Sequence, residues 1–171
     1  KMEHFHLPHN ELTIGDVLGE GSFGTVYKGT LHGETVAVKT MRVGKVTQSV
    51  LREYKEELLI MAPLRHKNLI SLVGGCWKDG PDKMCVVIEF AGRGTLSGML
   101  KDPEMTWDRA RRQWMEDTAC GLAYLHGLSP MVIHRDIKPD NILISASLTA
   151  KLADLGASTR VEFAAGNTET M

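Results

Sequence analysis

Two short stretches, His134–Asn141 and Lys151–Gly156, constrain this chain more than any other feature of its sequence. Between them lie two brief apolar runs on either side of the small polar turn Ser145-Ala146-Ser147. Short apolar runs around a polar turn are typical of an antiparallel β-hairpin. The sequence therefore predicts that the ends of both stretches meet at the open end of one hairpin.

Such a hairpin would bring oxygen-bearing side chains together. Symmetric pairing of the two runs puts Ile144 opposite Lys151, which places Asn141 beside Asp154. Amide and carboxylate oxygens suit Mg²⁺, which prefers a few hard oxygen ligands completed by phosphates and water. Asp136 lies five residues before Asn141, close enough to serve as a base at the same site. Metal ligands beside a base are the arrangement that phosphoryl transfer needs.

A glycine-rich turn lies near the start of the chain, between the strand-like runs Thr13–Leu18 and Thr25–Leu31. Its glycines are Gly19, Gly21 and Gly24. Glycine accepts positive φ and lets backbone N–H groups approach a phosphate closely. The dinucleotide-binding fingerprint has the same glycine spacing, but that loop opens a helix. Here the loop opens a β-branched and aromatic run, so the dinucleotide interpretation fails.

A third strand-like run, Thr35–Thr40, carries a lysine beside a small residue. Side chains alternate along a strand, so Ala37 and Lys39 share one face. Under a glycine loop, this pair leaves room for a flat base and supplies positive charge for phosphates.

Taken in order, the glycine loop, the strand lysine, the His-Arg-Asp stretch and the Asp-Leu-Gly stretch resemble the motif set of protein kinases. The resemblance runs from about Ile14 to the end and is greatest to the tyrosine-kinase-like group. It implies an α+β fold: an antiparallel five-stranded N-lobe with one regulatory helix, then the first part of a mainly helical C-lobe. The expected division is a lead-in over residues 1–12, N-lobe and hinge over 13–91, and partial C-lobe over 92–171.

The resemblance also implies residue roles, with ATP and Mg²⁺ as cofactors. Asp136 would accept the proton of the substrate hydroxyl, and Lys138 would neutralise the transferred phosphate. Lys39 would hold the α- and β-phosphates, while Asp154 and Asn141 would bind the metal ions. The expected nucleotide contacts are Gly19, Gly21, Gly24, Val26, Ala37, Lys39, Ile88, Glu89, Ala91 and Leu143. Of these, Ile88 would be the gatekeeper, and Glu89 and Ala91 would bond the adenine edge through their backbone.

An amphipathic helix is predicted from Val46 to Ala62, because apolar residues recur there at three- and four-residue steps. The apolar residues are Val50, Leu51, Tyr54, Leu58 and Met61. A glutamate of this helix should pair with Lys39, and the candidates are Glu53, Glu56 and Glu57. In kinases that glutamate lies seven residues before the leucine of an L-x-H-x-N segment, here Leu64. This register selects Glu57, with Glu53 as the runner-up.

Further elements are predicted downstream. Two strands are expected at Leu69–Val73 and Met84–Phe90, and a second helix at Trp107–His126. The residues expected to be buried on that helix are Ala110, Met115, Ala119, Leu122 and Leu125, with Trp107 and Trp114 packing in the core. Leu155, where kinases usually carry phenylalanine, should pack beneath the regulatory helix.

Composition excludes several other classes of protein. A formal net charge of −1 argues against nucleic acid or an acidic membrane as the main partner. No apolar run approaches the roughly 18 residues of a membrane span, so no membrane insertion is expected. Three cysteines without metal or disulfide spacing predict reduced thiols in a cytoplasmic protein. The histidines of residues 1–12 are interpreted as part of a solvated terminus.

Two functional hypotheses follow. The first is an ATP-dependent kinase that phosphorylates Ser/Thr hydroxyls of protein substrates, favoured by Lys138 in the catalytic loop. The alternative is a non-catalytic homologue that binds nucleotide or a partner kinase, suggested because the sequence ends at Met171, before the segments that complete a kinase domain. Ser158, Thr159, Thr168 and Thr170 would lie in an activation loop, where phosphorylation of Thr168 or Thr170 is expected to order the chain.

Overall fold

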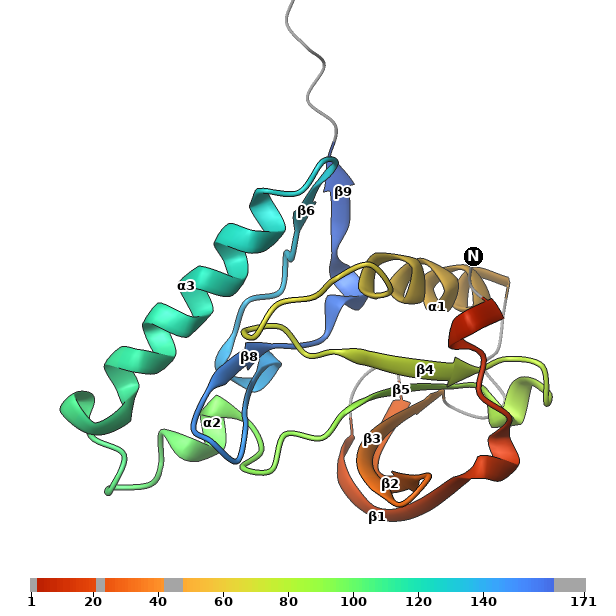
Figure 1. The fold of residues 1–171 in the computed structure, drawn as a ribbon, viewed down its shortest axis with the longest axis horizontal. Coiled ribbons are helices and arrows are strands. Elements are labelled where there is room, and N and C mark those ends of the chain that lie inside the picture. The colour runs from red at the N-terminus through yellow and green to blue at the C-terminus, as the bar shows by residue number, and fades with distance from the viewer. Residues whose placement is uncertain (1–2, 21–23, 42–47, 162–171) are drawn as a thin grey trace, which may run out of the picture.

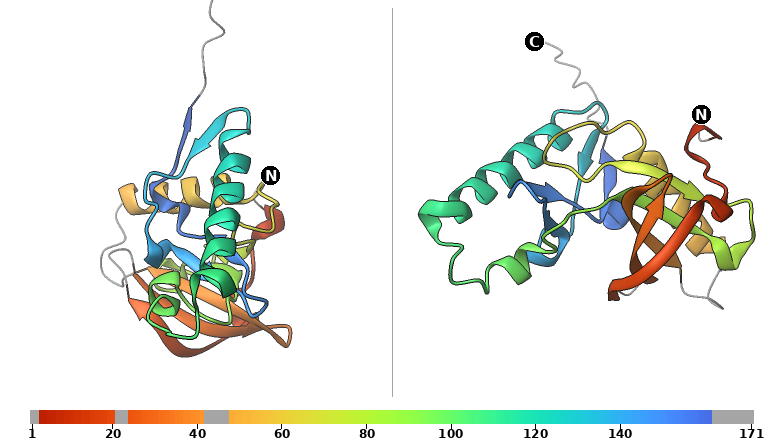
Figure 2. Two further views of the ribbon diagram at one scale, coloured as in Figure 1. Left: turned by 90° about the vertical axis from the view of Figure 1, so that its left-hand side faces the viewer. Right: turned by 60° about the horizontal axis from the view of Figure 1, so that its bottom comes forward.

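The structure, a computed structural model, describes residues 3–20, 24–41 and 48–161 of the 171-residue chain. Figures 1 and 2 show two parts: an antiparallel sheet with a helix beside it, and a second part dominated by one long helix. This is the α+β arrangement that the sequence predicts. No helix in the described ranges is long and apolar enough to cross a membrane.

The sheet has five strands in the order β1-β2-β3-β5-β4, and all neighbours are antiparallel. The strands are β1 Leu12–Glu20, β2 Gly24–Leu31, β3 Glu34–Met41, β4 Leu72–Cys76 and β5 Cys85–Glu89. A two-residue turn joins β2 to β3, and its residues His32 and Gly33 have φ values of 50° and 85°. Two successive positive φ values characterise the tight hairpin turn that matches strand twist.

Strand β4 begins three residues later than the predicted Leu69–Val73. The residues before it pair elsewhere: Ile70 N–H donates to the Leu152 carbonyl at 2.8 Å, and Leu152 N–H donates to the Asn68 carbonyl at 2.9 Å. The loop that leads into β4 is therefore bonded to the second part of the molecule. This link could not be read from β-propensity alone, because both pairings suit an apolar run.

Helix α1 spans Gln48–Met61, within the predicted range, and Val46 lies outside the described residues. The predicted apolar face is confirmed, since Tyr54, Leu58 and Met61 are all buried. These residues join a core that continues into the second part through Leu152 and other hairpin residues. One apolar core thus holds both parts together.

The described residues of the second part contain one long helix, several short helical pieces and four short strands. The helices are α2 Leu96–Met99, a π-helical turn Trp107–Arg111, α3 Arg112–His126 and two 3₁₀ turns, Pro139–Asn141 and Leu155–Ala157. The strands are β6 Met131–Ile133, β7 Ile142–Ile144, β8 Ala150–Leu152 and β9 Thr159–Val161. Strand β6 pairs with β9 and β7 with β8, both antiparallel. The hairpin expected from the sequence is therefore present.

The predicted register of that hairpin is wrong by one residue. Ile144 pairs with Ala150, not with Lys151, and Leu143 pairs with Lys151. The loop is one residue shorter than assumed, because Ser145 N–H bonds the Thr149 carbonyl at 3.0 Å and closes it. Asn141 consequently lies opposite Ala153 rather than Asp154, and Ala153 N–H donates to the Asn141 carbonyl at 2.9 Å.

The predicted buried face of the second helix is also partly wrong. Met115 is 61% exposed, Ala119 is exposed and Trp107 is 52% exposed. The buried side chains of α3 are Trp114, Asp117 and Leu125, together with Gly121. A side chain at Gly121 would lie 2.8 Å from the Asn68 carbonyl, so a glycine permits the close approach. Counting only apolar residues missed an aspartate and a glycine that set the buried side.

The N-terminal residues are not the solvated terminus that the sequence suggested. Residues 5–7 lie along β4, and Leu7 N–H donates to the Gly75 carbonyl at 2.9 Å. The His6 ring lies 4.7 Å from that of Trp77, centroid to centroid. A side chain at Gly74 would lie 2.6 Å from Leu7, so this strand has room for the segment only because it carries glycine there.

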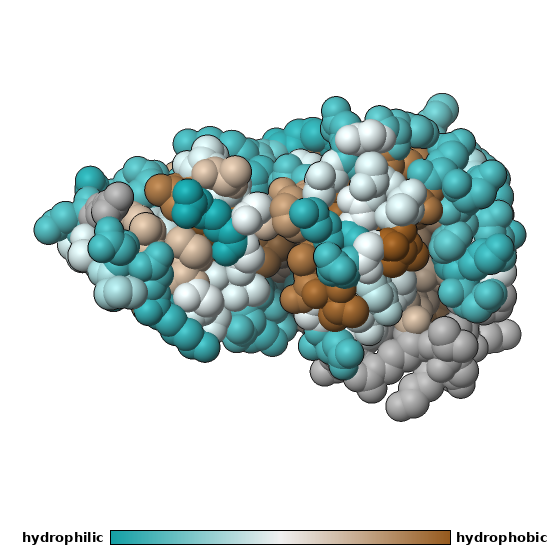
Figure 3. Space-filling model, turned by 90° about the horizontal axis from the view of Figure 1, so that it is seen from below, coloured by the Kyte–Doolittle hydropathy of each residue, from teal (hydrophilic) through white to brown (hydrophobic). Residues whose placement is uncertain are grey.

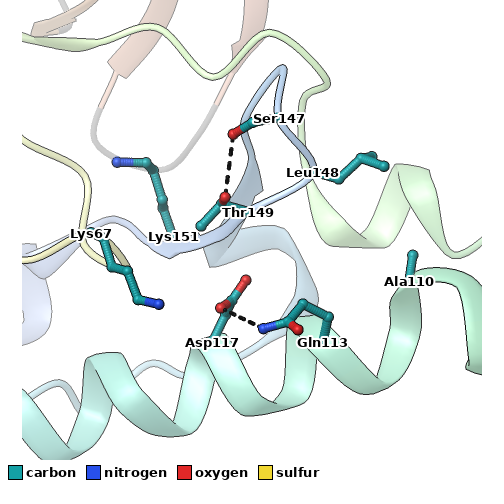
Figure 4. A pocket seen from close by; sticks show the side chains of 8 residues that line it. All are labelled: Lys67, Ala110, Gln113, Asp117, Ser147, Leu148, Thr149 and Lys151. Atoms are coloured by element: carbon teal, nitrogen blue, oxygen red, sulfur yellow. Dashed lines mark hydrogen bonds between the residues drawn. The ribbon is translucent and has the colours of Figure 1, made fainter.

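We predict that Asp117→Ala lowers the free energy of unfolding by about 1–3 kcal/mol, the cost of leaving a buried N–H without its acceptor. Asp117 is 3% exposed, accepts a hydrogen bond from Ala150 N–H at 2.9 Å and another from Gln113 at 3.1 Å (Figure 4). Urea denaturation measures the effect. The control is Glu116→Ala, which removes only an exposed pair with Arg112. Equal losses in the two variants would contradict a structural role for Asp117.

Candidate active site

Lys39 joins the two parts of the molecule. From the centre of β3 its Nζ lies 2.9 Å from Glu57 Oε1 on α1 and 2.9 Å from Asp154 Oδ1, two residues after β8. The Glu57 pairing is the one that the sequence register selects, and the rival Glu53 is exposed. Three elements far apart in the sequence therefore converge on one ammonium group.

Burial and charge act in opposite directions on Lys39. Burial alone would lower the pKa of this lysine, but the carboxylates of Glu57 and Asp154 outweigh it and hold the Lys39 pKa above its usual value. Its side chain is 20% exposed, so little water screens the three charges. Lys39 is therefore positively charged throughout the neutral range.

The backbone at Asp154 aims its carboxylate. Asp154 has φ 58° and ψ 70°, a left-handed conformation that non-glycine residues seldom adopt. The next residue, Leu155, is buried in the same core as Leu58 and Met61 of α1, as the sequence predicts. Gly156 follows closely, and a side chain there would lie 3.6 Å from the Glu57 carboxylate. This turn therefore packs tightly against the helix that carries Glu57.

A second polar cluster lies on the loop before β7. Asp136 Oδ2 accepts hydrogen bonds from Lys138 Nζ at 2.8 Å and from Asn141 Nδ2 at 2.7 Å. These two bonds hold the pKa of Asp136 below its usual value, and in turn the Asp136 carboxylate raises the pKa of Lys138. The buried His134 ring bonds the Ala153 carbonyl at 2.9 Å, which fixes the loop to the strand leading to Asp154.

Asn141 and Asp154 offer the chemistry that Mg²⁺ requires. Both provide hard oxygen ligands, and a magnesium ion commonly takes only one or two protein oxygens and completes its shell with phosphate and water. The described residues contain no group of three or more His, Cys, Asp or Glu that could hold a metal alone. A site that depends on phosphate oxygens is consistent with both observations.

Among the described residues, the expected nucleotide contacts lie on the sheet that carries Lys39, in the segment after β5 and on β7. In the register, Val26 pairs with Lys39 and Ala37 pairs with Ile88. Leu143 of β7 forms an isolated bridge with Thr95, six residues after the end of β5. At Gly24, the Cβ of any side chain would lie 1.8 Å from the Thr40 carbonyl oxygen. A further glycine of the loop for which a contact was expected, Gly21, lies outside the described residues.

The hinge residues are placed at the end of β5, and one backbone group there is already bonded. Glu89 N–H donates to the Ser71 carbonyl at 3.0 Å, so an adenine contact from Glu89 would use its carbonyl oxygen. The Ala91 carbonyl accepts from Gly94 N–H at 3.2 Å.

Seen from below, the molecule shows apolar patches near the middle of the face, with polar residues toward both ends (Figure 3).

Sequence reasoning missed an ion pair at the hinge. Lys151 Nζ of β8 lies 2.7 Å from Glu89 Oε1, and both side chains are largely buried. Lys28 also lies over the ring of Phe90, 5.3 Å from its centroid. Alternation along β8 is a signal for which side Lys151 faces, but no sequence signal indicates its partner.

The pocket in Figure 4 is separate from the Lys39 and Asp136 clusters, although Lys151 lines it. Its volume is about 450 Å³, and it lies between α3, the loop of the β7–β8 hairpin and Lys67. Neither Lys39 nor Asp136 nor Asp154 lines it. We assign the candidate site to the converging polar side chains, because they carry charge and geometry suited to phosphates, and not to this pocket.

We predict that Lys39→Met lowers the free energy of unfolding by about 2 kcal/mol at neutral pH, since two carboxylates lose their partner. The Lys39 pKa is higher in the folded than in the unfolded chain, so charged Lys39 stabilises the fold fully below the unfolded pKa of about 10.5. That stabilisation is lost as the pH rises through the folded-state pKa. The difference between wild type and variant should therefore shrink above pH 10.5. Urea denaturation from pH 7 to 11, with the exposed Lys55→Met as control, measures it. A difference that stays constant to pH 11 would contradict the prediction.

Comparison with known proteins agrees with this geometry. Residues 12–170 match the profile of the protein kinase domain. Three relatives are each 38% identical to this chain. "Probable serine/threonine-protein kinase drkB" of Dictyostelium discoideum matches over 151 residues, 87% of this chain and 21% of that protein. "Probable serine/threonine-protein kinase SIS8" of Arabidopsis thaliana matches over 149 residues, 86% of this chain and 14% of that protein.

A third relative, "Dual specificity protein kinase shkA" of D. discoideum, matches over 153 residues, 89% of this chain and 28% of that protein. Across these and similar relatives the chain spans between 9 and 28% of their length. Its profile match covers nearly all of its own residues and includes Lys39, Glu57, Asp136 and Asp154. This chain belongs to the protein kinase domain family.

Proposed function

We propose that this chain is the nucleotide-binding part of a protein kinase that transfers the γ-phosphoryl group of Mg-ATP to Ser/Thr hydroxyls of proteins. The observation that carries the proposal is the Lys39 ammonium held 2.9 Å from both Glu57 and Asp154. A lysine fixed by one carboxylate and placed beside a second, potentially metal-binding carboxylate suits the α- and β-phosphates of a nucleotide.

The cluster on the catalytic loop supports the transfer step. Asp136 is ionised at neutral pH, and Lys138 and Asn141 lower its pKa further, so its carboxylate is available to accept the proton of an incoming hydroxyl. Lys138 is charged and adjacent, and it would offset the negative charge on the transferred group. The chain thus provides a base and a cation at one place without any rearrangement of the loop.

Magnesium, when bound, would supply positive charge between the phosphates, with Asp154 and Asn141 as its protein ligands. The remaining work belongs to residues of the chain. Lys39 orients the phosphates, the hinge orients the base, and Asp136 orients the hydroxyl. Most of the rate enhancement in phosphoryl transfer comes from such positioning and charge neutralisation.

Serine and threonine are the proposed acceptors because Lys138 stands where Ser/Thr-type kinases carry lysine. The names of the drkB and SIS8 relatives agree with this choice, while shkA is named for dual specificity. Protein substrates, a partner kinase and a cytoplasmic location are part of the proposal. The three cysteines are free in the structure. A non-catalytic homologue would bind Mg-ATP equally well but would not transfer phosphate.

We predict that Mg-ATP raises the melting temperature of the chain. A ligand that binds only the folded state stabilises it by about 2.7 kcal/mol at a hundredfold excess over Kd. Differential scanning fluorimetry with millimolar Mg-ATP measures the shift, and Lys39→Met is the matched variant that should lose most of it. A cooperative melt that Mg-ATP leaves unchanged would contradict the nucleotide site.

We further predict that Asp136→Asn, in the protein that contains this chain, lowers phosphoryl transfer by about 10²–10⁴-fold while Mg-ATP binding persists. Transfer of radiolabelled γ-phosphate to a Ser/Thr peptide library measures activity. The control is Asp140→Asn, an exposed aspartate on the same loop. Binding without transfer in the wild-type protein would favour the non-catalytic alternative. Full activity of Asp136→Asn would contradict the role of that carboxylate.

A further inference from the structure

Tyr54 is buried on the helix that carries Glu57. It is 2% exposed and precedes Glu57 by three residues on α1. Its hydroxyl donates to two backbone carbonyls, those of Cys76 at 3.1 Å and Cys85 at 2.9 Å. The sequence pattern counted this residue only as part of an apolar face, whereas the structure gives it a polar contact as well.

The two acceptors belong to neighbouring strands. Cys76 of β4 and Cys85 of β5 are directly paired in the register of the sheet. A single hydroxyl therefore touches both strands of one hairpin from the side where α1 lies. Burial raises the pKa of Tyr54 above its usual value, so the hydroxyl keeps the proton that it donates.

A glycine makes this contact possible. A side chain at Gly75 would place its Cβ 2.6 Å from the Tyr54 oxygen, closer than real Cβ contacts allow. The neighbouring Cys85 carbonyl would lie 3.0 Å from the same Cβ. The hydroxyl therefore occupies space that an alanine at position 75 would take.

The hydroxyl restrains the same helix surface that presents Glu57. Residues three apart on an α-helix lie on one face, about 5–6 Å between Cβ atoms. Leu58 and Met61 also pack there, but apolar contacts are non-directional and tolerate small rotations. A hydrogen bond weakens steeply when its angle is lost. A rotation of α1 that withdrew Glu57 from Lys39 would therefore break the Tyr54 contacts too.

We propose that Tyr54 is a positioning residue for the Lys39–Glu57 ion pair, and that Gly75 is required because it leaves space for the Tyr54 hydroxyl. The restraint on α1 is argued from the contacts of Tyr54 and does not depend on the proposed function. Its effect on nucleotide affinity rests on the proposed function.

The first experiment removes the hydroxyl and keeps the ring. Tyr54→Phe should speed hydrogen–deuterium exchange of α1 amides by up to about tenfold, the factor that corresponds to one buried hydrogen bond, while exchange in β2 and β3 stays unchanged. Mg-ATP Kd should rise by a similar factor. The control is Tyr124→Phe on α3. It removes a hydroxyl that accepts a hydrogen bond from the Arg65 N–H at 3.1 Å. Exchange in α1 that is unchanged, or equally changed by the control, overturns the proposal.

The second experiment tests the shared space by a double-mutant cycle. Gly75→Ala should lower the melting temperature more in the wild-type background than in the Tyr54→Phe background, because the second has no hydroxyl to displace. Equal lowering in both backgrounds overturns the role of Gly75. Neither exchange nor melting requires nucleotide. If wild-type chain fails to bind Mg-ATP, the proposed function falls while these two measurements still decide the restraint.

Discussion

The Lys39 ammonium between two carboxylates is the interaction on which the rest of the site depends. One carboxylate comes from a helix beside the sheet and the other from the turn after the hairpin. Glu57, whose side chain is 11% exposed, depends most on this partner, because removing one member of a buried charge cluster leaves an uncompensated charge. The sheet, the helix and the hairpin are therefore held in one mutual arrangement by electrostatics as well as by the shared apolar core.

The residues of the site were largely predictable because their motifs are local. Glycines, the strand lysine and the catalytic-loop aspartate are recognised from neighbours a few residues away, and the Glu57 choice needed only a fixed spacing to Leu64. The strand-like runs and both long helices also follow from short-range patterns, whereas their assembly into one five-stranded sheet was implied by the resemblance to kinases. Local patterns identify elements well when the elements are long and regular.

What the sequence did not indicate depends mostly on polar contacts, several of them between distant residues. The hairpin register was wrong by one because the loop closes at Thr149, through side-chain hydroxyls that no apolar pattern records. The buried side of α3 was misassigned because Asp117 bonds the β8 backbone and Gly121 lies against Asn68. The pairing of Lys151 with Glu89 and the two acceptors of Tyr54 likewise join separate segments. In each case a polar partner decided what hydrophobicity left open.

The bonding of the loop before β4 to strand β8 anchors the chain beyond the C-terminal end of α1. Asn68 and Ile70, seven and nine residues after Met61, are hydrogen-bonded to Leu152. In a tilt of α1 about that end, each residue moves in proportion to its distance from Met61. With a rise of 1.5 Å per residue, Glu57 lies about 6 Å from Met61 and Gln48 about 20 Å. When the first turn of α1 is displaced in such a tilt, Glu57 moves only about a third as far. The Lys39–Glu57 pair is therefore less affected by motion at the far end of the helix.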